Sequence, residues 1–307
     1  MDRSIPHNVT LVEVGPRDGF QFEARVVPTE QKLAIIARLV GAGLRQIQVA
    51  SFVNPAKVPQ MADAEQLIQG LPPSDDVRYS ALVLNRRGLD RALASGIQAV
   101  EISLSASDTH SRKNAGMGHD DALRQGLAMI DWAVAAGLDV RASVQCAFGC
   151  VYEGPIDVSR IAAIVRRFVD HGAQILALAD TTGMASPPTI SAALEAVLPL
   201  ASRLPVALHL HDTRGLGLVN LTTALQHGIS IFDTALAGMG GCPFVPGAAG
   251  NIATEDTIHL LDALGIATGV DHLRLGAVSR DLESFFEKSF PGRMHRLTAV
   301  GPLPPTA

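Results

Sequence analysis

The chain has 307 residues, of which 47% are hydrophobic and 18% charged, with a formal net charge of -5. This composition is typical of a globular protein with a large core, and the acidic balance gives no reason to expect nucleic acid or an anionic membrane as a partner. Three cysteines, an odd number in a chain this long, argue against a disulfide framework and for a reducing compartment.

The first apolar run, Val9 to Val14, is too short for a secretory signal, and no apolar stretch reaches the roughly 20 residues that span a bilayer. We therefore expect a cytoplasmic protein without membrane contact. The last residues, Pro302 to Ala307, are expected to form a frayed tail.

Strand-like segments recur along the chain, and each is followed by a helix-like segment. The expected strands are Thr10–Val14, Gln46–Ala50, Arg78–Val83, Ala99–Leu104, Asp139–Gln145, Ile175–Ala179, Pro205–His211 and Ser230–Ala235. The expected helices are Thr29–Ala42, Met61–Gln69, Arg86–Ser95, Asp120–Ala136, Asp157–His171, Pro187–Ser202, Gly217–His227 and Ile252–Leu264. Several of these helices end at a glycine before the next strand, which is a usual helix C-terminal signal.

Eight strands alternating with eight helices indicate an α/β protein with a TIM (β/α)8 barrel. A doubly wound open sheet has the same alternation, but no GxGxxG motif follows the first strand and no linker divides the chain. We expect one domain over residues 1–307, with the barrel at about 9–270 and a C-terminal helical extension at about 271–300. Its helix is expected at Ala277–Ser289.

The active site of such a barrel lies at the carboxyl ends of the strands, so polar residues there are candidates. Arg17 and Asp18 follow the first strand between glycines. Asp18 offers a hard oxygen ligand for a divalent ion, and the guanidinium of Arg17 can hold a carboxylate or a developing oxyanion. Taken alone, the pair also fits an ion pair in a surface turn.

Strand seven carries His209 and His211, which point to the same face because they are two residues apart. Imidazoles at a barrel mouth are good metal ligands, although paired histidines also occur in protein cores. Asp180 ends the apolar run of strand six, where a carboxylate is costly unless it is paired. A catalytic role and a helix N-cap are both open for it.

A glycine-rich loop, residues 238–251, follows the eighth strand and carries Cys242 in its middle and Asn251 at its end. Glycine lets backbone approach a ligand closely, and a long loop in a compact chain is often a functional lid. A flexible connector is the alternative. Asp18, His209, His211 and Asn251 come from strands one, seven and eight, which are neighbours in a closed barrel. This nitrogen and oxygen set suits Mg²⁺ or Mn²⁺ acting as a Lewis acid.

With these residues in view, the sequence resembles the hydroxymethylglutaryl-CoA lyases, within the wider group of metal-dependent TIM-barrel lyases and Claisen-type synthases. The resemblance extends from Thr10 to about Gly269, and the cysteine loop is its most specific element. The matching motifs are VEVGPRDGFQ (12–21), ASFVNPAKVPQMAD (50–63), CAFGCVYEG (146–154), ADTTG (179–183), HLHDTRG (209–215) and GMGGCPFVPGAAGNIATED (238–256).

The resemblance implies cleavage of hydroxymethylglutaryl-CoA to acetyl-CoA and acetoacetate, with a divalent metal as cofactor and an acyl-CoA as the small-molecule partner. It places the metal ligands at Asp18, His209, His211 and Asn251. The catalytic residues it implies are Arg17 at the thioester oxygen, Cys242 as the loop cysteine that handles a proton, Asp180, and His209 in addition to its role as a ligand. We also expect a homo-oligomer, and we expect Arg112 and Lys113, after strand four, to meet the phosphates of CoA.

Three positions depart from the family pattern: Gln48 stands where a glutamate is usual, Ala177 where a serine is usual, and Arg214 where a tyrosine is common. A sister lyase acting on another acyl-CoA, such as citramalyl-CoA, therefore stays open. More distant alternatives are a synthase that runs the reverse condensation and a non-catalytic protein that binds metal and CoA. If the family's glutamate helps to relay a proton, Gln48→Glu should raise cleavage of hydroxymethylglutaryl-CoA relative to the natural substrate.

Overall fold

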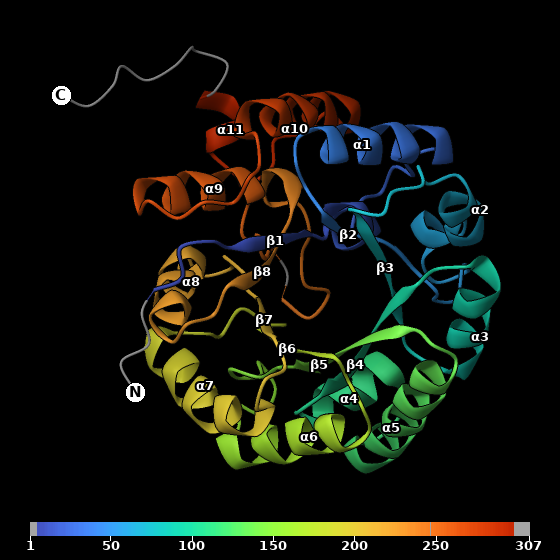
Figure 1. Cartoon of the computed structure of the whole chain (residues 1–307), viewed down its shortest axis with the longest axis vertical. Helices are drawn as coiled ribbons and strands as arrows, with labels where there is room; N and C mark the ends of the chain where they lie inside the picture. The colour runs from blue at the N-terminus through green and yellow to red at the C-terminus, as the bar shows by residue number, and fades with distance from the viewer. Residues whose placement is uncertain (1–4, 246, 298–307) are drawn as a thin grey trace.

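The fold is a closed parallel barrel with helices around it (Figure 1). The computed structural model describes residues 5–245 and 247–297. The eight strands follow one another in sequence order, and the last one pairs with the first, Thr10 lying opposite Ile231. They are β1 (Thr10–Glu13), β2 (Gln46–Ser51), β3 (Arg78–Val83), β4 (Ala99–Ser105), β5 (Asp139–Gln145), β6 (Ile175–Ala179), β7 (Val206–His209) and β8 (Ile231–Thr234). The predicted TIM barrel is confirmed, and the open sheet is excluded.

Eight helices alternate with the strands and form the outer ring seen in Figure 1. They are α1 (Thr29–Gly41), α2 (Ala64–Gln69), α3 (Arg86–Ser95), α5 (His119–Ala135), α6 (Val158–Asp170), α7 (Pro187–Ala201), α8 (Gly217–Gln226) and α9 (Thr254–Ala263). The expected helices agree with these to within a few residues. Short turns of helix at η1 (Gly15–Gly19), η2 (Pro59–Met61) and η3 (Leu236–Gly238) were not predicted.

One further helix, α4 (Asp108–Ala115), lies between β4 and α5, where the sequence analysis predicted no helix. Its ends carry ordinary signals: the Ser107 side chain accepts a hydrogen bond from His110 N at 3.0 Å, and Gly116 adopts a left-handed φ of 75°. It was missed because it is short and polar and has no apolar stripe. Arg112 and Lys113 are therefore helical residues.

The C-terminal helical extension is present and consists of α10 (His272–Phe286) and α11 (Met294–Leu297). Helix α10 begins five residues before the expected Ala277 because Asp271 caps it, its side chain accepting from the backbone N–H groups of Leu273 and Arg274. The extension packs beside α1 and α9 (Figure 1). The expected tail, Pro302 to Ala307, lies outside the described residues.

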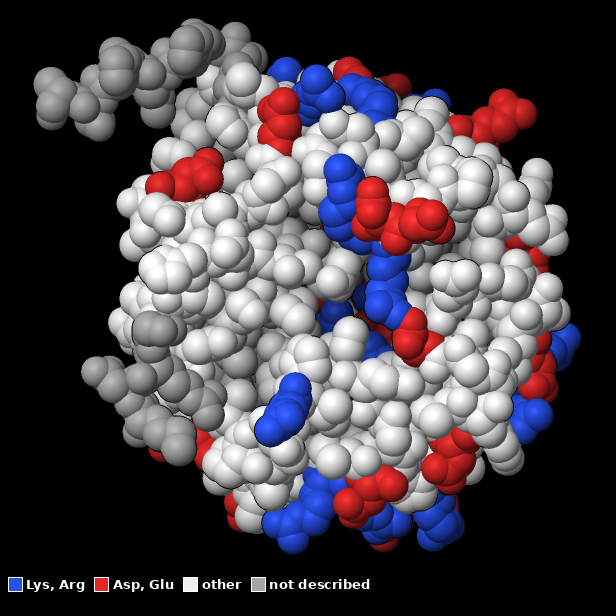
Figure 2. All heavy atoms as spheres, in the orientation of Figure 1, with Lys and Arg blue, Asp and Glu red and all other residues white. Residues whose placement is uncertain are grey.

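The core lies between the barrel and the helix ring and is built from the buried aliphatic faces of both. Inside the barrel, by contrast, several strand residues are charged or polar, among them Gln48, Glu101 and Asp233. No helix within residues 5–245 and 247–297 has the length and apolar character needed to cross a membrane. Figure 2 shows the face of Figure 1 hollowed near its centre, with basic and acidic side chains close together there.

Candidate active site

A cavity of about 140 Å³ opens at the carboxyl ends of the strands. This is the end at which TIM barrels carry their active sites. The candidate residues of the sequence that line it are Arg17, Asp18, His209, His211 and Cys242, and further polar residues of its wall are Glu101, Ser103, His110, Asn114, Ser143 and Gln145. The structure thus brings together residues from the turn after β1, from the end of β7 with the residues that follow it, and from the loop after β8.

Arg17 and Asp18 sit in the single helical turn η1, which follows β1 directly. Glu13 fixes this turn, because its Oε1 accepts from the backbone N–H groups of Gly15 at 2.7 Å and Leu236 at 3.0 Å. A Cβ at position 15 would lie 2.5 Å from the same oxygen, so only glycine fits. The buried Glu13 carboxyl therefore has the structural task of joining the Arg17 turn to the chain after β8.

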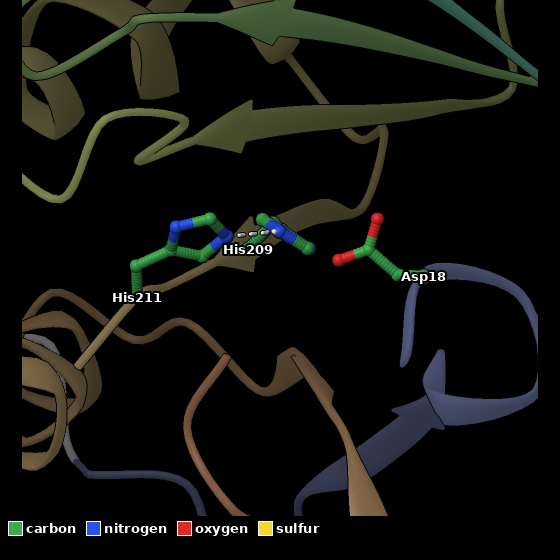
Figure 3. Close-up of side chains that lie close together, drawn as sticks. All are labelled: Asp18, His209 and His211. Carbon is green, nitrogen blue, oxygen red and sulfur yellow. Dashed lines mark hydrogen bonds between the residues drawn. The ribbon is translucent and has the colours of Figure 1, made fainter. Parts of the chain in front are cut away.

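Asp18, His209 and His211 each offer one ligand atom, and these atoms lie within 4.8 Å of one another. Figure 3 shows the Asp18 carboxylate directed at the imidazoles of His209, at the end of β7, and His211, two residues further along the chain. The two Nε2 atoms of the histidines are 3.0 Å apart. Two nitrogen lone pairs at this distance repel each other unless a proton or a cation lies between them, so the geometry suits a shared cation.

The protonation states favoured by the surroundings also suit a cation. Burial, followed by the charge of His209, lowers the pKa of His211 to about 3, so its imidazole is neutral at neutral pH. Burial opposes ionisation of Asp18, but Arg17 and His209 outweigh it and hold the pKa of that carboxyl below its usual value. Asp18 and His211 are therefore in the forms that bind metal, whereas for His209 burial is outweighed by the hydrogen bond to Asp233 and the pKa is raised, so a metal ion competes with a proton at this imidazole.

Asn251 contacts this cluster, and its side-chain oxygen accepts no hydrogen bond from the described residues. Its Nδ2 donates to Asp18 Oδ2 at 2.8 Å and to the carbonyl oxygen of Met239 at 3.0 Å. Its buried Oδ1 has no partner within the described residues. An amide oxygen, a carboxylate and two imidazoles form a donor set that fits a divalent ion. Glycine is needed at position 240, two residues before the loop's cysteine, since a Cβ there would lie 2.5 Å from Asn251 Nδ2.

The guanidinium of Arg17 is buried beside the cluster. It forms an ion pair with Asp18 through Nη1, and its Nε donates to Gln48 Oε1 at 2.5 Å. The amide of Gln48 in turn donates from Nε2 to Glu101 Oε2 at 2.9 Å. Arg17 thus lies in the cavity wall with its donors oriented from two sides, which is the arrangement expected of a group that stabilises an oxyanion.

The imidazole of His209 is oriented by Asp233 and Arg141, two residues that the sequence analysis did not identify. Its Nδ1 lies 3.1 Å from Asp233 Oδ2, and Asp233 accepts two hydrogen bonds from Arg141 at 2.8 and 2.7 Å. Arg141 Nε is also 3.4 Å from Glu101 Oε2. Since the carboxylate of Asp233 holds the proton on Nδ1, the Nε2 lone pair of His209 faces the cluster. Charged residues inside otherwise apolar strands are the signal that could have revealed these positions.

Asp180 lies just behind the cavity wall, which is formed by Ala179 and Thr181 on either side of it. Its Oδ1 accepts from the backbone N–H of Ala185 at 2.9 Å, and its Oδ2 has no partner within the described residues. Burial raises the pKa of this carboxyl to about 7. It is not a helix N-cap, because α7 has Ser186 in a capping box.

Arg214 does not add a charge to the cleft. Its Nη1 donates to the carbonyl oxygens of Thr182 at 3.0 Å and Gly183 at 2.5 Å, so it ties the loops after β6 and β7 together. Arg112 and Lys113 also lie outside the cavity lining. Arg112 pairs with Asp108 at 2.8 Å, and the Lys113 ammonium lies 5.0 Å from the ring centre of Tyr152.

The cysteine loop folds over the cavity and buries Cys242 in its wall. Two residues on, Phe244 packs edge-on against His110 of α4, with ring centres 4.7 Å apart, and against Tyr152 at 6.1 Å. Burial raises the pKa of the Cys242 thiol. The loop is therefore held down on the same helix that lines one side of the cavity, with a protonated thiol facing inward.

Comparison with known proteins gives consistent matches over nearly the whole chain. A family model described as HMGL-like matches residues 8–282. The chain is 40% identical over 272 residues to the mitochondrial hydroxymethylglutaryl-CoA lyase of Bos taurus, covering 89% of this chain and 84% of the relative. It is 39% identical to hydroxymethylglutaryl-CoA lyase YngG of Bacillus subtilis over 288 residues, covering 94% and 96%.

Solved structures show the same likeness. An HMG-CoA lyase from Acinetobacter baumannii, solved in complex with coenzyme A and 3-methylmalate, superposes with a TM-score of 0.91 at 34% identity. The superposition covers 97% of this chain and 98% of the other. The agreement in fold therefore extends over the complete barrel and its C-terminal helices.

Proposed function

The chain belongs to the HMGL-like family and is a carbon–carbon lyase, and on this premise we propose that it cleaves hydroxymethylglutaryl-CoA to acetyl-CoA and acetoacetate. The observation that carries the proposal is the convergence of Asp18, His209 and His211 within 4.8 Å, in a cavity that Arg17 and Cys242 also line. The complex of a structural relative with coenzyme A and 3-methylmalate supports a CoA ester with a branched hydroxy acid as substrate class.

We assign metal binding to Asp18, His209, His211 and the free amide oxygen of Asn251, with Mg²⁺ or Mn²⁺ as the ion. These residues would hold the ion beside the substrate, where it would polarise the substrate oxygens and lower the pKa of the β-hydroxyl. Arg17 stabilises the negative charge that develops on the thioester oxygen as the bond between the α and β carbons breaks. The β carbon leaves as the ketone of acetoacetate.

The enolate of acetyl-CoA then needs a proton at its α carbon, which we assign to the thiol of Cys242. Burial keeps this thiol protonated at neutral pH, so it enters the reaction as an acid, and the loop that carries it shields the enolate from water. The proton released by the β-hydroxyl needs an acceptor, and Asp180, with its unpaired Oδ2 beside the cavity wall, is our candidate.

The test is to incubate the purified protein with Mg²⁺ or Mn²⁺ and a panel of β-hydroxyacyl-CoA esters that includes citramalyl-CoA, and to follow acetyl-CoA release. We expect metal-dependent release with hydroxymethylglutaryl-CoA as the best substrate. Release from citramalyl-CoA alone would move the substrate assignment to the sister lyase, and no release from any ester would refute the lyase reaction. Binding of Mn²⁺, followed by calorimetry, should be lost in His211→Ala.

The cytoplasmic location and the homo-oligomeric state expected from the sequence stay predictions. Light scattering coupled to size-exclusion chromatography tests the second of them directly.

A further inference from the structure

A neutral side chain, Gln48, lies between two buried charges of opposite sign. Its Oε1 accepts from the guanidinium of Arg17 at 2.5 Å, and its Nε2 donates to the carboxylate of Glu101 at 2.9 Å. Gln48 is 1% exposed and Glu101 is 6% exposed, so water does not substitute for either partner. The orientation of the amide is therefore decided by its two neighbours.

The two ends of a glutamine amide are not equivalent, because one only accepts and the other only donates. An ionised carboxylate only accepts, so Glu101 forces Nε2 to its own side and Oε1 to the side of Arg17. Without that carboxylate, Nε2 of Gln48 loses its acceptor and the amide is held only by the donor at Arg17 Nε. The amide is then free to move toward another acceptor, which would leave Arg17 without its partner at Nε.

Glu101 is itself held in place by residues deeper in the barrel. Ser103 donates to Glu101 Oε1 at 3.1 Å, and Arg141 Nε lies 3.4 Å from Oε2. Arg141 is anchored on its other side by two hydrogen bonds to Asp233. Arg141 thus compensates the negative charge of Glu101 from deeper in the barrel, and the contact with Gln48 connects this carboxylate, which also lines the cavity, to Arg17.

We propose that Glu101 is a positioning residue for Arg17, acting through Gln48. The inference rests on the proposed function only in taking Arg17 as the group that stabilises the enolate. Asp18 pairs with Arg17 directly through Nη1, whereas at Nε the partner is the neutral amide of Gln48 and the carboxylate behind it, Glu101, belongs to β4 rather than β2. The guanidinium therefore keeps more of its charge for the substrate than it would beside a carboxylate at position 48.

This arrangement changes what Gln48→Glu is expected to do. A glutamate at position 48 would bring a second carboxylate to about the 2.9 Å that now separates Gln48 Nε2 from Glu101 Oε2. Two carboxylates at this distance repel, and one of them must take up a proton or move away. The gain in hydroxymethylglutaryl-CoA cleavage predicted from the sequence is therefore not expected from Gln48→Glu alone.

The test compares Glu101→Gln, Gln48→Glu and the double variant, which moves the carboxylate from β4 to β2. We expect each single variant to lower kcat about tenfold, below the roughly 10²–10³ that follows loss of a whole oxyanion donor. KM should change little, and the double variant should recover most of the lost kcat. Asp139→Asn is the control, because it removes the charge of a carboxylate on β5 that pairs with Arg78, is 46% exposed and does not line the cavity; it should retain kcat within about twofold.

Unchanged kcat in Glu101→Gln, or a double variant no better than the worse single one, would overturn the proposal. Crystal structures of the wild type and Glu101→Gln give a readout that does not depend on activity: we expect the contact between Arg17 Nε and residue 48 to be lost in the variant, and its retention would also overturn the proposal. A wild type that cleaves no ester would count against the proposed function, whereas these structures would still decide the role of Glu101.

Discussion

Replacing Asp233 by asparagine keeps the size of the side chain that contacts His209 but removes its negative charge. Asp233 is 1% exposed, accepts two hydrogen bonds from Arg141 and faces His209 Nδ1 at 3.1 Å. Asparagine keeps one acceptor oxygen and the same size, but its NH₂ group meets Arg141 Nη1 if it takes the place of Oδ1, and both Arg141 Nη2 and His209 Nδ1 if it takes the place of Oδ2. In either orientation at least one hydrogen bond is replaced by two donors facing each other.

Two effects of different size follow. Loss of the partner that fixes the proton on a metal-binding histidine typically lowers metal affinity by about 10- to 100-fold, and we expect that range for Mn²⁺. Breaking a buried ion pair costs about 3–5 kcal/mol of stability. Because Glu101 still lies 3.4 Å from Arg141, we expect the free energy of unfolding to fall by about 3 kcal/mol, the lower end of that range.

Calorimetric titration with Mn²⁺ and urea unfolding measure the two effects on the same samples. The matched control is Asp139→Asn in β5, where Asp139 pairs with Arg78 and both side chains are 46% exposed. An exposed pair contributes about 0–1 kcal/mol, so this variant should unfold nearly as the wild type does and bind Mn²⁺ equally well. A folded Asp233→Asn variant with wild-type Mn²⁺ affinity would refute the role of Asp233 in orienting His209.

Three further predictions concern the cavity and its supports. Arg17→Met should leave the protein folded but lower kcat about 10²–10³-fold, and near-normal turnover would leave the arginine only a structural role. The double variant Arg112→Ala, Lys113→Ala should raise KM for the CoA ester at low ionic strength, where charge contacts are least screened, and an unchanged KM would exclude phosphate contacts. Burial raises the pKa of Glu13 to about 8, so the folded protein holds a proton that the unfolded chain releases above about pH 4.5. Between these two pH values the free energy of unfolding therefore falls as pH rises, by about 1.4 kcal/mol per pH unit. Glu13→Gln should remove this slope between about pH 5.5 and about pH 7.5 in urea unfolding, whereas parallel slopes would contradict it.

The barrel could be predicted because the sequence signals for each strand and helix lie within that element. Each strand and helix carries its own pattern of apolar residues and its own end signals, and residues such as Arg17 or His211 could be placed because they directly follow a strand. Asn251 could be placed in the same way, at the end of a glycine-rich loop. What such patterns cannot give is which side chains meet across the barrel.

The residues that orient the site are distant in sequence from those they orient. Gln48 meets Glu101 across 53 positions, and Arg141 meets Asp233 across 92. No spacing rule connects such pairs, and a lone charge within an apolar strand shows only that some partner is needed. The orientation of Arg214 was hidden for the same reason, since the two carbonyl oxygens that hold it belong to the loop after β6.

TIM barrels usually fill their interior with branched apolar side chains, yet here the layer beneath the cavity contains Gln48, Glu101, Arg141 and Asp233. Buried charges of this kind add little stability compared with apolar packing, so their presence needs another reason. The contacts run without a break from Arg17 through these four residues to His209, and Arg141 serves both carboxylates at once. Oxyanion stabilisation and metal binding therefore depend on one shared set of hydrogen bonds, and substitutions at its two ends should not act independently.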